Sequence, residues 1–216
     1  MNFTIKTLWN SIPISGDRHV QLVLSSTPEN DHLLIEIHAP FFNDSLPLGP
    51  VGPFANLWNY EVVELFFLAS STNHYIELEF SPHGHYLVLL LTDRRKLLKD
   101  MLQLTEYRVE PPLLDRWYGR VLVPRAHFPA HIDLFNAYAI HGEDDNRIYE
   151  ALYPAPMEST KPDFHRLELF QPLNFEKLLN IGDEDGDSWN NQASHSVHNY
   201  SLLFLILVLT ILLWKL

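Results

Sequence analysis

The sequence predicts an all-β fold, an antiparallel β-sandwich, followed by a polar linker and a C-terminal hydrophobic helix. Short apolar segments recur between turn residues along most of the 216 residues, without amphipathic helical segments between them. Such spacing is typical of a sandwich rather than of an α/β sheet. A hydrophobic content of 46% is sufficient for a sizeable core. We expect the sandwich to span residues 1–172, a short helix and acidic linker 173–199, and the hydrophobic tail 200–216.

Ten segments have the length and composition of strands, and turn residues such as Ser81-Pro82-His83-Gly84 bound them. They are residues 19–24, 32–38, 60–68, 74–80, 85–91, 104–109, 117–123, 134–141, 147–152 and 164–170. The Pro-rich stretch 40–53 is predicted to be a long loop, and long loops in compact domains are often functional. Asn174 is a candidate N-cap for a short helix over residues 175–179.

Alternation along the strands indicates which side chains share a face, because residues two apart point the same way. Tyr75, Glu77 and Glu79 share one face of their strand, and we expect that face to be the acidic, outer one. The segment 60–68 is apolar on both faces except for Glu61 and Glu64, which predicts a central strand. A carboxylate at the position of Glu64 then needs a partner or a ligand.

Two interpretations of these polar and aromatic residues remain open. Glu64 is either half of a buried structural pair or a ligand contact. Tyr75, Glu77 and Glu79 form either a solvated sheet face or a platform for sugar hydroxyls, which carboxylates bind well. Trp58, Tyr60 and Trp117 are candidates for stacking on a sugar ring and equally candidates for the core. Trp58 directly follows the Pro-rich loop, where an aromatic ring at the rim of a site is expected.

Charge and residue content exclude several function classes. Without cysteine, the chain forms no disulfide, no thiolate metal site and no cysteine nucleophile. A net charge of −12 argues against a nucleic-acid partner, which needs a basic surface. The twelve histidines match no recognised zinc spacing, and no P-loop, G-x-S-x-G or G-x-G-x-x-G motif is found. We therefore expect no metal, no cofactor and no enzymatic activity.

The C-terminal region divides into an acidic stretch and a hydrophobic one. Residues 181–199 contain an acidic cluster followed by Asn, Ser and His, which predicts a flexible linker. Residues 200–214 carry no charge and would extend roughly 22 Å as a helix, slightly less than a bilayer core. A tail anchor that leaves the domain facing the cytosol is one interpretation. A variant final exon, with a soluble cytoplasmic domain, is the other.

Four stretches resemble an uncharacterised family named after a vertebrate chromosome-four open-reading-frame protein. They are LWNYEVVELFF at 57–67, YIELEFSPHG at 75–84, FNAYAIHG at 135–142 and PDFHRLE at 162–168. The resemblance covers most of the chain up to about residue 172, and the hydrophobic tail departs from it.

That family in turn is similar to the DOMON-like sandwich of family-nine carbohydrate-binding modules, which clamp a terminal sugar between two aromatic rings. The resemblance implies that Trp58 is one clamp ring and Glu64 the acidic hydrogen-bonding residue. Trp117 and Tyr138 are candidates for the second ring. The function expected is a non-catalytic binding module for a carbohydrate or similar polyhydroxy ligand. The alternatives are a protein-interaction scaffold without a small ligand and a haem-binding DOMON-like domain.

Overall fold

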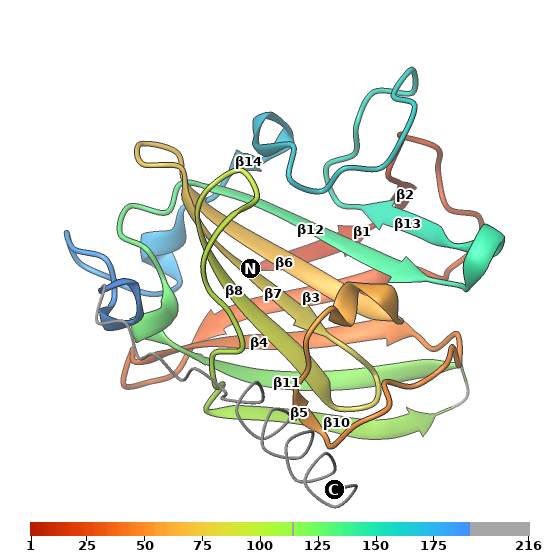
Figure 1. Cartoon of the computed structure of the whole chain (residues 1–216), viewed down its shortest axis with the longest axis horizontal. Coiled ribbons are helices and arrows are strands. Elements are labelled where there is room, and N and C mark those ends of the chain that lie inside the picture. Colours follow the sequence, from red (N-terminus) through yellow and green to blue (C-terminus); the bar gives the residue numbers. More distant parts are fainter. Residues whose placement is uncertain (114, 191–216) are drawn as a thin grey trace, which may run out of the picture.

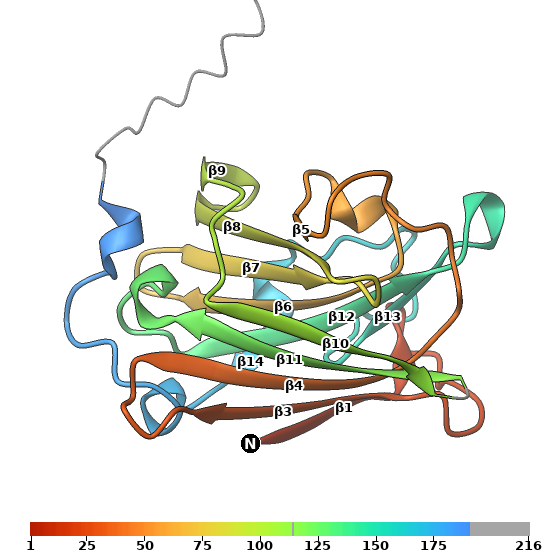
Figure 2. The same ribbon diagram turned by 90° about the horizontal axis from the view of Figure 1, so that it is seen from below.

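Two β-sheets pack face to face in the computed structural model, which describes residues 1–113 and 115–190 (Figures 1 and 2). The smaller sheet has the order β1 (Asn2–Ile5), β3 (Val20–Ser26), β4 (His32–Pro40), β11 (Arg116–Pro124) and β10 (Glu106–Leu113). All of its neighbouring strands are antiparallel.

The larger sheet has the order β2 (Thr7–Leu8), β13 (Ile148–Ala151), β12 (Leu134–His141), β6 (Val62–Ala69), β7 (His74–Phe80), β8 (His85–Asp93) and β5 (Gly52–Pro53). In addition, β14 (Gln171–Pro172) pairs with β12, and β9 (Lys96–Lys99) pairs with β8. Its strand pairs are antiparallel except β5 and β8, which run parallel. The predicted all-β sandwich of two antiparallel sheets is therefore confirmed.

Alternation builds the core between the sheets. On β4, Leu33, Ile35 and Ile37 point inward and are fully buried, while Glu36 and His38 lie on the other face. From the larger sheet, Leu65 and Phe67 of β6 enter the same cluster. Strand β6 is buried along its whole length between β12 and β7, as its two apolar faces predict.

The strand expectations hold for nine of the ten segments and fail for residues 164–170. That segment is a loop containing the 3₁₀ turn η4 (Leu167–Leu169). Local bonding explains the difference, because the Asp163 carboxylate accepts the backbone N–H of His165 at 3.0 Å and so turns the chain. The short strands β1, β2, β5, β9 and β14 lie outside the segments expected.

The expected helix over residues 175–179 is a single 3₁₀ turn, η5 (Phe175–Lys177), and its N-cap residue Asn174 makes no side-chain cap. Within residues 1–113 and 115–190, the helical elements are all 3₁₀ turns. Besides η4 and η5, they are η1 (Leu57–Asn59), η2 (Arg125–His127), η3 (Asp144–Asn146) and η6 (Asp187–Trp189). In the same residues, no helix has the length and apolarity needed to cross a membrane.

The acidic stretch that begins at residue 181 is packed on the domain over residues 181–190, contrary to the flexible linker expected there. Trp189 is buried, its indole N–H donates to the carbonyl of His127 at 3.0 Å, and its ring stacks on His74. The Asp185 carboxylate accepts the backbone N–H of Ala130 at 2.8 Å. Burial of an aromatic ring offsets the ordering entropy that an all-polar linker could not. The remaining linker, 191–199, and the expected hydrophobic helix at 200–216 lie outside the described residues.

Replacing Gly186 by alanine should detach this segment, because a Cβ there would overlap the backbone of Ala126. We expect the Trp189 indole N–H to lose its protection from hydrogen exchange, as measured by NMR. The control is Glu184→Ala, an exposed side chain of the same segment. An unchanged indole exchange rate in Gly186→Ala would contradict this packing.

Candidate functional site

A cavity of about 570 Å³ lies on the outer face of the larger sheet. Its floor is formed by Glu64 of β6, Glu77 of β7 and three leucines of β8. Its walls come from the segment around η1, from β12 and Tyr149 of β13, from the β8–β9 turn and the residues after it, and from the loop at 162–165. The site therefore brings together segments that are distant in the sequence.

Burial of this outer face corrects a prediction from the sequence. Tyr75, Glu77 and Glu79 do share one face of β7, but that face is buried rather than acidic and solvent-facing. A second apolar cluster covers it, built from Leu57, Val62, Phe66, Leu68, Tyr75, Leu87, Leu89, Leu91, Tyr138, Ile140, Ala151 and Phe170. Strand β8 is apolar on both faces, which is typical of a strand covered on both sides.

Three carboxyl groups lie together on the floor. Glu64 of β6 is directly opposite Glu79 of β7, and Glu77 is two residues along β7 on the same face. Glu64 and Glu77 are 2% and 4% exposed. One oxygen of Glu64, one of Glu77 and both of Glu79 have no hydrogen-bond partner within the described chain. Buried oxygens of this kind are costly unless a ligand or a proton satisfies them.

Burial favours the protonated form of these carboxyl groups. It raises the pKa of Glu64 to about 8, and the charge of Arg147 acts in the opposite direction. Burial also raises the pKa of Glu77 and of Glu79 well above the ordinary value, and the proximity of Glu64 raises both further. Burial therefore favours the neutral form of the floor carboxyls, and a neutral carboxyl can both donate and accept a hydrogen bond.

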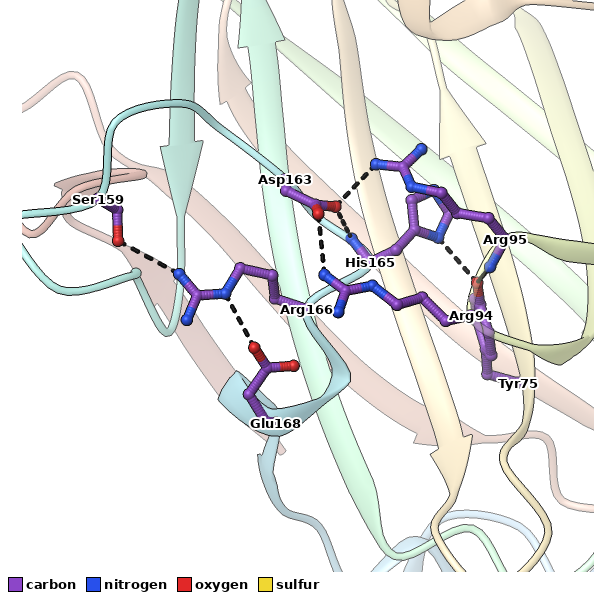
Figure 3. A network of polar contacts seen from close by, with 8 residues as sticks. All are labelled: Tyr75, Arg94, Arg95, Ser159, Asp163, His165, Arg166 and Glu168. Atoms are coloured by element: carbon purple, nitrogen blue, oxygen red, sulfur yellow. Dashed lines mark hydrogen bonds and ion pairs between the residues drawn. The ribbon is translucent and has the colours of Figure 1, made fainter.

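A polar network forms the wall beside Glu77 (Figure 3). The backbone N–H of Arg95 donates to the Tyr75 hydroxyl at 3.1 Å, and that hydroxyl lies 2.8 Å from Nδ1 of His165. The Tyr75 hydroxyl thus bonds both the Arg95 backbone and the His165 ring. The other ring nitrogen of His165, Nε2, lies 3.9 Å from the Glu77 carboxyl. Burial, followed by the charge of Arg95, lowers the pKa of His165 to about 4, so the ring is neutral.

Two arginines hold the loop that carries His165. Arg94 and Arg95, in the turn between β8 and β9, donate to the two oxygens of Asp163 at 2.9 and 2.7 Å (Figure 3). These bonds lower the pKa of Asp163 against the effect of its burial. Farther along the same loop, Arg166 bonds Glu168 and Ser159. The wall is therefore fixed to the strand turn by charge-assisted bonds.

Aromatic rings line the upper part of the cavity. Trp58, in η1, is 40% exposed, and it lines the cavity together with Tyr149 and Phe164. Phe164 stacks on Tyr138, with centroids 3.9 Å apart and the rings nearly parallel. Tyr138 is buried beneath it and does not line the cavity. Of the three clamp candidates, Trp58 lines the cavity, and Trp117 and Tyr138 do not. The other two rings that line it are Tyr149 and Phe164.

The candidate residues from the sequence lie at the cavity, beside it on the same sheet face, or away from it. Trp58, Glu64 and Glu77 line the cavity, and Tyr75 and Glu79 are buried on the same sheet face beside it. Tyr60 follows η1 and packs edge-on against Phe54 instead. Trp117 is on β11 of the opposite sheet, 3% exposed and part of the core between the sheets.

Sequence reasoning missed Arg95, Asp163, Phe164 and His165. Phe164 and His165 lie in the segment 164–170, which was expected to be a strand, and Asp163 directly precedes it. The adjacent acid, aromatic ring and histidine were the available signal, since such a group is unusual in a sheet strand. No group of three or more His, Asp or Glu able to hold a metal ion occurs in residues 1–113 and 115–190.

None of the known protein-family profiles matches the chain. A solved structure described as a "putative carbohydrate-binding protein from Bacteroides uniformis" has a similar fold, with a TM-score of 0.59. The match covers 80% of this chain and 84% of that one, and the sequences are 14% identical. This likeness supports the sandwich architecture.

Vertebrate relatives are far closer in sequence. The rat protein named UPF0462 protein C4orf33 homolog is 44% identical over 200 residues, covering 90% of this chain and 95% of its own. The human UPF0462 protein C4orf33 is 41% identical over 200 residues, with the same coverage. The zebrafish homolog is 40% identical over 196 residues, covering 88% and 93%. The chain therefore belongs to the UPF0462 (C4orf33) family.

Proposed function

We propose that this protein is a non-catalytic binding module for a carbohydrate or a similar polyhydroxy ligand, held in the cavity over β6, β7 and β8. The observation that carries the proposal is the set of buried carboxyl groups, Glu64 and Glu77 above all, that face the cavity without hydrogen-bond partners in the described chain. Sugar hydroxyls supply both the donors and the acceptors that such groups lack.

The walls suit the same ligand. Trp58, Tyr149 and Phe164 provide apolar ring surfaces for the C–H faces of a sugar, while the carboxyl groups bind its hydroxyls. A volume of about 570 Å³ is within the range of small-ligand sites and accommodates one or two sugar rings. The fold shared with the Bacteroides uniformis protein, itself described as carbohydrate-binding, also supports the proposal.

Replacing Trp58 by alanine should weaken sugar binding about tenfold, because the stacking surface at the rim is lost. Titration calorimetry with monosaccharides and disaccharides, chosen from a glycan array, measures the effect. The control is Leu48→Ala, a 91% exposed apolar side chain outside the cavity. It should leave the affinity unchanged.

Three outcomes would overturn the proposal. If no glycan on the array binds and no sugar shifts the melting temperature, a protein-interaction scaffold becomes the better reading. A Soret absorption band in the purified protein would indicate haem in place of a sugar. Equal sugar affinity in Trp58→Ala and wild type would place the ligand elsewhere.

A further inference from the structure

We infer that the preferred ligand of this cavity carries a protonated amine, so that it is an amino sugar rather than a neutral or acidic one. The inference rests on the proposed carbohydrate function and narrows it to a charge class. Three buried carboxyl groups, Glu64, Glu77 and Glu79, lie together beneath a cavity without a cation bonded to them in the part of the chain that the structure describes.

The nearby guanidinium groups are already engaged. Arg95 lines the cavity, but its side chain donates to Asp163 at 2.7 Å, and Arg94 donates to the same carboxylate. Arg147, whose charge lowers the pKa of Glu64, donates to the carbonyl oxygens of Asn59, Gly142, Trp58 and Tyr60. His165 is neutral, as described above. The charges of Arg147 and Arg95 act on Glu64 and Glu77 from a distance, but the unpartnered floor oxygens are left to bond a proton or a ligand.

Three further groups near the floor, Tyr138, Asp100 and Asp163, carry no positive charge. Tyr138 of β12 faces Glu64 and is neutral, because burial raises its pKa. Asp100 is a further acid on the cavity wall, whereas Asp163 on that wall is paired with Arg94 and Arg95. A uronate or phosphate brings no positive charge to the floor carboxyls and would be repelled by any of them that ionises, whereas an ammonium group brings three N–H donors and one positive charge.

The aromatic wall tolerates that charge. Trp58, Tyr149 and Phe164 line the same space, and a cation placed over the face of an aromatic ring is attracted to it. Displacing the proton of Glu64 is inexpensive: with a pKa of about 8, ionising it at pH 7 costs about a factor of ten in affinity. A charge-assisted bond to the ligand more than offsets that factor.

Calorimetry of the full-length protein at pH 7 with matched sugars tests the inference. The probes are glucosamine, galactosamine, their N-acetyl forms, glucose, galactose and glucuronic acid. We expect the amines to bind about tenfold more tightly than the neutral sugars. We also expect about one proton to be released per amine bound, measured from the heats in two buffers of different ionisation enthalpy.

Variants localise the effect. Glu64→Gln keeps the side-chain volume but should abolish both the proton release and the preference for the amine. Glu29→Gln, on an exposed turn, should change neither.

The failures are distinguishable. Neutral sugars that bind as tightly as the amines, or amine binding without proton release, would overturn this inference and leave the carbohydrate function standing. Absence of binding by every sugar would overturn the carbohydrate function itself.

Discussion

Replacing Trp117 by alanine should lower the free energy of unfolding by about 3–5 kcal/mol, the usual cost of removing a large core ring. The side chain is 3% exposed in the core between the sheets. It also packs so closely over Gly119 that a Cβ added there would lie 2.8 Å from the ring. The partners of Trp117 belong to both sheets, so little relaxation can fill the void.

Trp58→Ala is the matched comparison, because the same ring is removed from a side chain that is 40% exposed at the cavity rim. It should cost about 1 kcal/mol or less. Urea denaturation followed by far-UV circular dichroism measures both variants. Equal losses in the two would contradict the separation of a core tryptophan from a ligand-facing one.

The second large effect is a loss of stability as the pH rises from 6.5 to 8. Burial raises the pKa of Glu64 to about 8 and that of Glu61 to about 7, and those of Glu77 and Glu79 well above the ordinary value. In this window the folded state holds protons that the unfolded state, with carboxyl pKa values near 4.3–4.5, has released. The stability contributed by these groups is complete below the unfolded pKa and is lost as the pH passes through the folded one.

The slope can approach about 1.4 kcal/mol per pH unit for each carboxyl that stays protonated, so Glu64 alone contributes on the order of 2 kcal/mol by pH 8. Three histidines have lowered pKa values, chiefly through burial: His165, His127 and His83. They act in the opposite direction, because the unfolded state binds their protons between about pH 4 and 6.5. The two effects oppose each other most strongly below pH 6.5; above it the histidine effect fades over about one pH unit, whereas the carboxyl effect continues.

Urea unfolding at several pH values measures this dependence. Glu64→Gln should flatten the decline above pH 6.5, since it removes one titrating group and the charge that raises the pKa of Glu77 and Glu79. Glu29→Gln is exposed and should leave the slope unchanged. A wild-type stability that is constant from pH 6.5 to 8 would show that the floor carboxyls are ionised in the folded protein.

Strand β7 shows how far the burial of a strand face can be predicted from the sequence. Period-two alternation correctly grouped Tyr75, Glu77 and Glu79 on one face, because that grouping depends only on the geometry of a single strand. Whether the face is wet depends on what covers it. The cover comes from η1, the β8–β9 turn and the loop at 162–165, none of which a local pattern connects to β7.

The positions of Trp58 and Trp117 also could not be predicted from local sequence and were decided by the tertiary structure. Each has the composition and context of a ring next to a strand, and the sequence left both open as stacking or core residues. Only the pairing of β11 within the smaller sheet directs Trp117 into the core, whereas η1 holds Trp58 at the cavity.

By itself, the sequence determined the two-sheet architecture, the central position of β6 and the buried carboxyl of Glu64. These follow from local alternation and from composition, which act over a few residues. The tertiary structure decided that Glu77 and Glu79 join Glu64 beneath a cavity, that His165 and Asp163 form its wall, and that residues 181–190 pack on the sandwich. Those outcomes depend on contacts between segments that are in some cases more than 100 residues apart, and no local pattern records the energies of such contacts.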